Sequence, residues 1–246
     1  MQRFARLSIV LLVCAPLSLA ALQEISEQPP LYRGPVTEVQ GVFVTPVAGV
    51  PFTATVAIRS EHPAADGTMD SRHTVTQIAR DSSGRIRNER HMLVPDSFHG
   101  TPPLIAVHIF DPATRLSNIY NPATMISRQM KLPPPAQTAR SDSTPGTENL
   151  GTTTLNGLEA KETRVTRTIP AQFSGTGKPV QVIDEIWYSE DLNMNLLERH
   201  TDPRGGVQTV AITSFQREEP PPSLFEVPGG YKIVDMTPPE KPAGPN

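Results

Sequence analysis

The sequence predicts an all-β protein: an antiparallel meander that forms a curved half-barrel or a sandwich-like sheet, with few helices. Three observations predict it: short runs rich in Thr, Val and Ile that alternate apolar with polar residues, frequent turn residues between these runs, and 27 prolines among 246 residues. Alternation with a period of two is the pattern of a half-buried strand. Proline removes a backbone donor and clashes inside helices, so a helical bundle is disfavoured.

The strands follow one another with a turn signal after most of them. In the first strand Ala54, Val56 and Ile58 share one face. Asp81–Gly84 and Asn156-Gly157 predict tight turns, because their side chains bond the local backbone or accept positive φ. The predicted strands are residues 53–59, 72–80, 85–93, 104–110, 115–120, 124–131, 152–155, 158–168, 180–188, 194–200 and 207–216.

Residues 1–20 have the order of a secretory signal peptide. Arg3 and Arg6 precede an apolar run at 7–19, and Ser18-Leu19-Ala20 supplies small residues before the expected cut. The run is too short to span a membrane, so no transmembrane segment is expected after signal removal. The single cysteine, Cys14, lies in this run, so the mature chain is expected to carry no disulfide. The protein is therefore expected to be exported, periplasmic or secreted.

The rest of the chain divides by composition. Residues 21–40 are polar and broken by prolines, which predicts an extended lead-in. Residues 41–235 are expected to form a single β-rich domain that contains a Pro/Ser/Thr-rich loop at 132–150. Residues 236–246 hold four prolines and no core-forming run, and are expected to be a disordered tail.

Charge and motifs exclude several functions. The formal net charge is −3 and the pI is about 6.1, which argues against a strongly basic nucleic-acid binder. The chain has no nucleophile elbow, zinc-protease helix, phosphate loop or dinucleotide fingerprint. No cofactor is expected.

Several polar residues are candidates for a site. His91, Asp96 and His99 could hold a metal, but their spacing matches no standard ligand pattern, and a polar loop is the favoured interpretation. His108 lies in an apolar run and is expected to be a hydrogen-bonded interior histidine. Asp184 shares a strand face with apolar residues and is expected to pair with an arginine.

Arginines and one tryptophan are the remaining candidates for ligand binding. Arg85 and Arg87 share a strand face beside the Asp81–Gly84 turn and could bind an anionic group, although a solvated hairpin is the favoured interpretation. Trp187, the sole tryptophan, is expected either in the packed core, which is favoured, or in the lining of a ligand cleft.

The second half of the chain carries a recognisable ending. It consists of residues 185–192 (EIWYSEDL), 200–206 (HTDPRGG), 217–220 (REEP) and 223–228 (SLFEVP), followed by Tyr231. This ending resembles a group of exported bacterial proteins without assigned activity. In pattern, the strands also resemble the curved half-barrels of the outer-membrane lipoprotein carrier. That looser resemblance implies a concave face that takes acyl chains.

Three functions remain open at this point. The first is a non-enzymatic envelope protein that binds an apolar ligand, such as a lipid, or an envelope protein through a curved sheet. The second is a hydrolase that uses loop His and Asp residues, which the missing motifs disfavour. The third is an interaction module without a ligand pocket.

Overall fold

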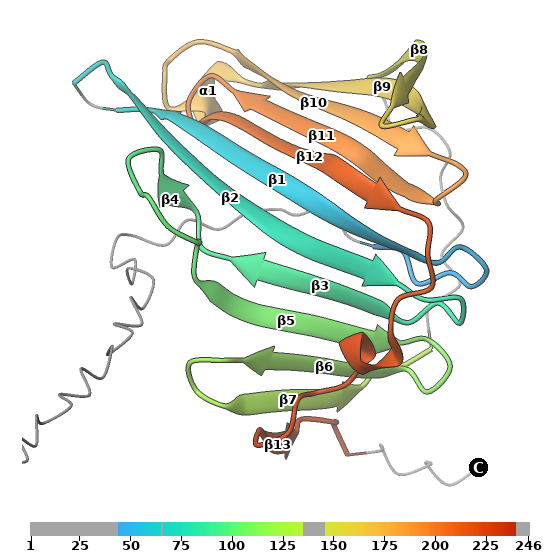
Figure 1. Ribbon diagram of the computed structural model, residues 1–246. Helices are drawn as coiled ribbons and strands as arrows, with labels where there is room; N and C mark the ends of the chain where they lie inside the picture. The colour runs from blue at the N-terminus through green and yellow to red at the C-terminus, as the bar shows by residue number, and fades with distance from the viewer. Residues whose placement is uncertain (1–43, 65, 135–145, 240–246) are drawn as a thin grey trace, which may run out of the picture.

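The computed structural model describes residues 44–64, 66–134 and 146–239. Their strands form one open, curved sheet (Figure 1), which confirms the predicted all-β class. Within these residues the helices are α1 (Ala171–Ser174) and the 3₁₀ turn η1 (Pro222–Phe225), each four residues long. Neither is long enough to cross a membrane. The predicted signal peptide and lead-in lie outside the described residues.

The strands follow the chain as a series of hairpins. In chain order they are β1 (Phe52–Pro63), β2 (Met69–Arg80), β3 (Ile86–His91), β4 (Val94–Pro95), β5 (Leu104–Asp111), β6 (Leu116–Asn121), β7 (Ile126–Lys131), β8 (Thr147–Leu155), β9 (Leu158–Ile169), β10 (Val180–Ser189), β11 (Met194–Asp202), β12 (Gly206–Gln216) and β13 (Lys232–Asp235).

Across the sheet the order is β13-β7-β6-β5-β3-β2-β1-β12-β11-β10-β9-β8, and β4 pairs with β2 beside β3. Neighbouring strands are antiparallel, except that β13 runs parallel to β7. The first and last thirds of the chain therefore meet at the centre, where β1 pairs with β12 over nine registered residue pairs.

Two predicted turns set the register of their hairpins. Asn156 and Gly157 both have positive φ, 51° and 76°, which is the geometry of a two-residue hairpin turn between β8 and β9. Gly84 has φ 86° and closes the turn between β2 and β3 by donating its N–H to Asp81 O. A Cβ at Gly84 would meet the backbone of Val47 at 3.0 Å, so the residues before β1 pack directly on this turn.

The main core lies under β1 and β2. Alternate residues of β1, from Phe52 to Ser60, are buried, as the sequence alternation predicted. Arg80, at the end of β2, is also fully buried. Its guanidinium donates to three backbone carbonyls, Val50 O at 2.9 Å, Thr45 O at 2.9 Å and Leu192 O at 2.8 Å. Carbonyls from two distant parts of the chain, residues 45–50 and Leu192, therefore converge on one side chain.

A second core cluster holds the C-terminal segment. We call residues 217–231 the strap, because they leave β12 and cross β3, β5 and β6 on the side that faces the viewer in Figure 1. Phe225 of the strap is 6% exposed and packs with Val107, Ile109 and Tyr120. Tyr231 meets the ring of Tyr120 edge-on at 5.0 Å. The strap leads to β13, which pairs with β7 at the edge of the sheet.

Two predicted irregular segments are more ordered than expected. β8 begins at Thr147, inside the predicted 132–150 loop, because its backbone pairs with β9. The first residues of the predicted tail are bonded to β7: Met236 N donates to Gln129 O at 2.7 Å, and Thr237 Oγ1 accepts from Lys131 N at 3.0 Å. Residues 135–145 and 240–246 of these segments lie outside the described part.

Candidate functional site

A row of apolar side chains crosses five strands at the middle of the sheet. Register places Val75 of β2 opposite Ala57 of β1, Ala57 opposite Ala211 of β12, Ala211 opposite Leu197 of β11, and Leu197 opposite Trp187 of β10. Residues directly opposite each other in antiparallel strands project to the same face. We call these five residues the apolar row.

Polar side chains border the apolar row on both sides. On one side lie Arg59, two residues after Ala57, and its cross-strand partner His73, two residues before Val75. Both side chains bond Asp96, at 3.1 and 3.0 Å. On the other side, Gln77 Nε2 donates to Thr55 Oγ1 at 3.1 Å. The apolar row therefore has polar neighbours on both sides where it crosses β1 and β2.

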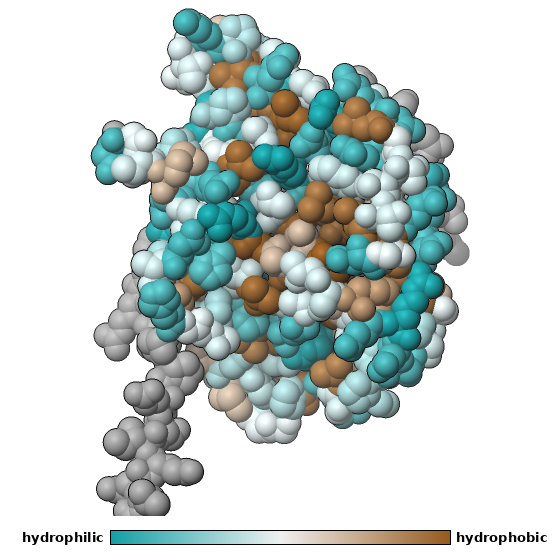
Figure 2. Space-filling model, turned by 45° about the horizontal axis from the view of Figure 1, so that its top comes forward, coloured by the Kyte–Doolittle hydropathy of each residue, from teal (hydrophilic) through white to brown (hydrophobic). Residues whose placement is uncertain are grey.

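The apolar row is partly open to solvent. Val75 is 45% exposed, and the other members of the row are half-buried. Figure 2 shows apolar side chains gathered at the middle of the molecule's face, with hydrophilic side chains around them. Strands lie about 4.8 Å apart, so the four spacings of the row give a length of about 19 Å. An extended acyl chain or an apolar peptide segment has comparable dimensions.

Trp187 lies at the end of the apolar row. A β-bulge in the pairing of β10 with β11 falls directly after it, between Trp187 and Tyr188. Its side chain is half-buried and packs against the main core cluster. By register its backbone ends the apolar row, and its side chain contacts the core.

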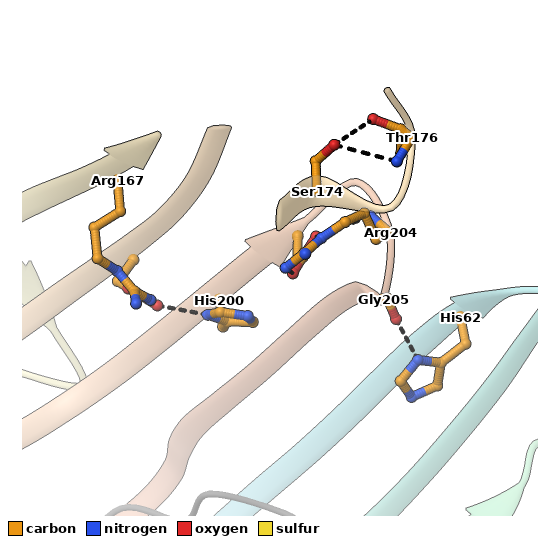
Figure 3. A network of polar contacts seen from close by, with 9 residues as sticks. His62, Arg167, Ser174, Thr176, His200, Arg204 and Gly205 are labelled. Atoms are coloured by element: carbon orange, nitrogen blue, oxygen red, sulfur yellow. Dashed lines mark hydrogen bonds and ion pairs between the residues drawn. The ribbon is translucent and has the colours of Figure 1, made fainter. Parts of the chain in front are cut away.

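A polar network occupies the ends of β9 to β11 (Figure 3). Asp184 accepts hydrogen bonds from His200 Nδ1 at 2.5 Å and from Arg167 Nη2 at 2.9 Å, the arginine partner that the sequence predicted. Burial opposes the ionised carboxylate, but these two donors outweigh it and lower the pKa of Asp184. Next to it, hydrogen bonds from Arg204 hold the pKa of Asp202 at about 2. These charges are neutralised within the network.

His62 and Ser60 form a contact that resembles a nucleophile and its base. His62 Nδ1 donates to Gly205 O, so Nε2 of the neutral ring accepts from Ser60 Oγ at 2.8 Å. Ser60 is fully buried in the main core. A nucleophile must reach its substrate, and this hydroxyl is closed to one, so the pair is a structural contact.

The predicted metal candidates point to separate partners. His91 donates from Nδ1 to Pro102 O at 2.8 Å and pairs with Glu89 at 3.2 Å. Asp96 bonds Arg59 and His73 instead, and His99 is exposed. Within residues 44–64, 66–134 and 146–239, no group of three or more His, Cys, Asp or Glu side chains is placed to hold a metal ion. The structure does not bring His91, Asp96 and His99 together.

Arg85 and Arg87 are directed at the protein's own groups. Arg85 Nε donates to Asp81 Oδ2 at 2.6 Å. Arg87 bonds Glu89 at 2.8 Å and the hydroxyl of Tyr120 at 2.8 Å. The predicted interior histidine, His108, bonds Ser117 Oγ at 2.9 Å.

Most of the apolar row was not singled out from the sequence. Ala57, Ala211 and Leu197 are unremarkable until the pairing of β1, β12 and β11 is known. The available signal was weak: small or apolar residues at the solvent-facing positions of otherwise alternating strands. Trp187 was the one member of the row that its size made conspicuous.

No family model matches the chain, and no curated protein matches it. Solved structures with some likeness include an uncharacterised conserved protein from Thermus thermophilus, with 13% identity and a TM-score of 0.42, over 76% of this chain and 91% of that one. MucB in its complex with MucA from Pseudomonas aeruginosa gives 12% and 0.39, over 75% and 58%. A LolA superfamily protein from Nitrosomonas europaea gives 14% and 0.31, over 73% and 91%. At these values the likenesses assign no function.

Proposed function

We propose that the protein is a non-enzymatic binder of an extended apolar ligand, an acyl chain of a lipid, which lies in the apolar row. The observation that carries the proposal is the unbroken run of five apolar side chains across five strands, open to solvent and bordered by polar residues. Burying such a row against an acyl chain removes apolar surface from water, which favours binding. We further propose that binding takes place outside the cytoplasm, because residues 1–20 have the order of an export signal.

The experiment uses the sole tryptophan as its reporter. Dodecanol, which is uncharged and does not fluoresce, is titrated into the purified protein while the emission of Trp187 is followed. We expect a saturable blue shift, because the ligand displaces water from the half-buried indole. Val75→Arg and Ala211→Phe should each weaken binding about tenfold, a loss of about 1.4 kcal/mol. The first puts a charge in the apolar row, and the second replaces a small side chain of the row with a large ring.

Phe173→Arg is the matched control. Phe173 lies on α1, outside the apolar row, and is 73% exposed, so its replacement introduces the same charge away from the row. Equal weakening by Phe173→Arg and Val75→Arg would contradict the proposed site. An emission of Trp187 that does not change with dodecanol would contradict the proposed function.

A further inference from the structure

One face of the strands β3, β5, β6, β7 and β13 has an unusual charge. Register places Asn88 opposite His108, His108 opposite Ile119, and Ile119 opposite Arg128. Alternation adds Arg90, two residues after Asn88. Lys232 joins them because it pairs with Ile126, two residues before Arg128. We call this side of the five strands the basic face.

No carboxylate of these five strands lies on the basic face. The acidic residues in the strands are Glu89, Asp111 and Asp235. Each alternates with the basic-face residues of its own strand, so its side chain projects to the other face. The strap crosses that other face, so it does not cover the basic one.

The cations of the basic face have no partner within the described residues. Arg90, Arg128 and Lys232 are exposed and take part in no ion pair there. Several arginines elsewhere on the sheet are paired, as Arg59 is with Asp96 and Arg167 with Asp184. The excess of positive charge also affects a histidine on this face. Burial, and then the positive charge of Arg90, lower the pKa of His108.

Apolar side chains lie among these cations. Ile119, at the centre of the face, is 48% exposed, and Phe110, Ile126 and Met130 are half-buried on the same side. From β3 to β13 there are four strand spacings, so the cations are spread over about 19 Å. A single headgroup would need cations converging on one point, whereas a spread of this width suits an array of negative charges.

We infer that the basic face docks on the surface of a lipid bilayer that contains anionic headgroups, with Ile119 entering the interface. Charge complementarity favours this partner, because the face carries cations without carboxylates, and juxtamembrane Lys and Arg residues are attracted to anionic leaflets. The exposed isoleucine favours a bilayer over a nucleic acid, which would be held by aromatic stacking and a denser basic groove. This inference concerns the face opposite the apolar row and does not depend on the proposed function.

The test is co-sedimentation of the full chain with vesicles of phosphatidylcholine, with and without phosphatidylglycerol. We expect salt-sensitive binding to the mixed vesicles only. Each Lys or Arg near such a surface contributes about fivefold in partitioning, so Arg90→Gln with Arg128→Gln should weaken binding roughly 25-fold. Ile119→Asp should weaken it as well, without a change in the dodecanol response of Trp187.

The matched control is Lys178→Gln with Arg199→Gln. Both residues are exposed and unpaired within the described residues, and they lie away from the basic face, so this double variant removes the same net charge. Its binding should stay within about twofold of the wild type. All variants keep the same N-terminal segment, so differences among them report on the face alone. Equal losses in the two double variants, equal binding to both kinds of vesicle, or binding to single-stranded DNA in place of vesicles would overturn the inference.

Discussion

His91 and Glu89 form a half-buried ion pair on β3, 3.2 Å apart. Burial opposes both charges, but the contact between them outweighs it. The pKa of His91 is raised through Glu89 and Pro102 O, and the pKa of Glu89 is lowered through His91 and Arg87. Any such shift couples the free energy of unfolding to pH.

This pair should stabilise the protein most between about pH 4.5 and 6.5, the ordinary pKa values of the two groups. The contribution of His91 is complete below its ordinary pKa and is lost as pH rises through the raised one. That of Glu89 is complete above its ordinary pKa and is lost as pH falls through the lowered one. We expect His91→Gln to cost about 1–2 kcal/mol in this window, measured by urea unfolding at several pH values.

His99→Gln serves as the comparison, because His99 is exposed. Its unfolding free energy should track the wild type across the window. If the deficit of His91→Gln were the same at pH 8 as at pH 5.5, the pair would not be the source of the coupling.

Some residue environments were predictable, and others needed the pairing of distant strands. Asp184 needed a partner because its neighbours on the strand are apolar, and Arg167 supplies it. Arg80 gave no such signal. It stands directly before the predicted Asp81–Gly84 turn, yet it is fully buried and bonds three carbonyls. Those carbonyls belong to segments up to 112 residues away, and no local pattern identifies them.

The hairpin of β11 and β12 depends on Gly206. Its φ is 101°, and a Cβ built on it would lie 1.8 Å from Glu61 O of the neighbouring strand β1. Gly206→Ala should therefore destabilise the protein by about 3 kcal/mol, through backbone strain and displacement of β1. Thermal unfolding of the purified variant measures this.

Gly205 provides the matched substitution one residue earlier. It has no positive φ, and the nearest atom to its added Cβ is Asp202 Cβ at 3.9 Å. Gly205→Ala should stay within about 0.5 kcal/mol of the wild type. Similar losses at both positions would mean that the turn, and not the approach to β1, limits the hairpin.

Strand prediction succeeded where alternation is long and failed where strands are short. β1 alternates over its buried half, and its hydrophobic period is visible without a structure. β4 and β13 have two and four residues, too few to show a period, so their strand conformation depends on the backbones of β2 and β7. β8 was missed at its start for a similar reason, because it is a polar edge strand whose structure comes from pairing with β9.

At the scale of the whole molecule, two core clusters divide the sheet. The main cluster lies around β1, β2 and β12, and the second lies under the strap, over β5 and β6. Phe225→Ala should cost about 3–5 kcal/mol, because it removes a large ring from the second cluster. Hydrogen exchange should then show lost protection in β5 to β7 and retained protection in β1 and β12.

Phe173→Ala removes the same ring from an exposed site, at 73% exposure against 6% for Phe225. Its exchange pattern should match the wild type. A uniform loss of protection in Phe225→Ala, reaching β1 and β12 equally, would indicate one cooperative unit in place of two.

The buried guanidinium of Arg80 also bears on how the chain folds. Its partners come from residues 45 and 50 at one end of the sequence and from Leu192 far along it. The chain must therefore close a loop of more than one hundred residues before this side chain can leave water with its donors satisfied, and such loops carry an entropy cost that local contacts do not. The pairing of β1 with β12 joins residues that are even further apart in the chain. Until both ends of the chain are available, Arg80 remains hydrated, and the central hairpin of β1 and β2 keeps one unpaired edge. The last strands to join therefore complete the sheet and remove water from this arginine in the same step.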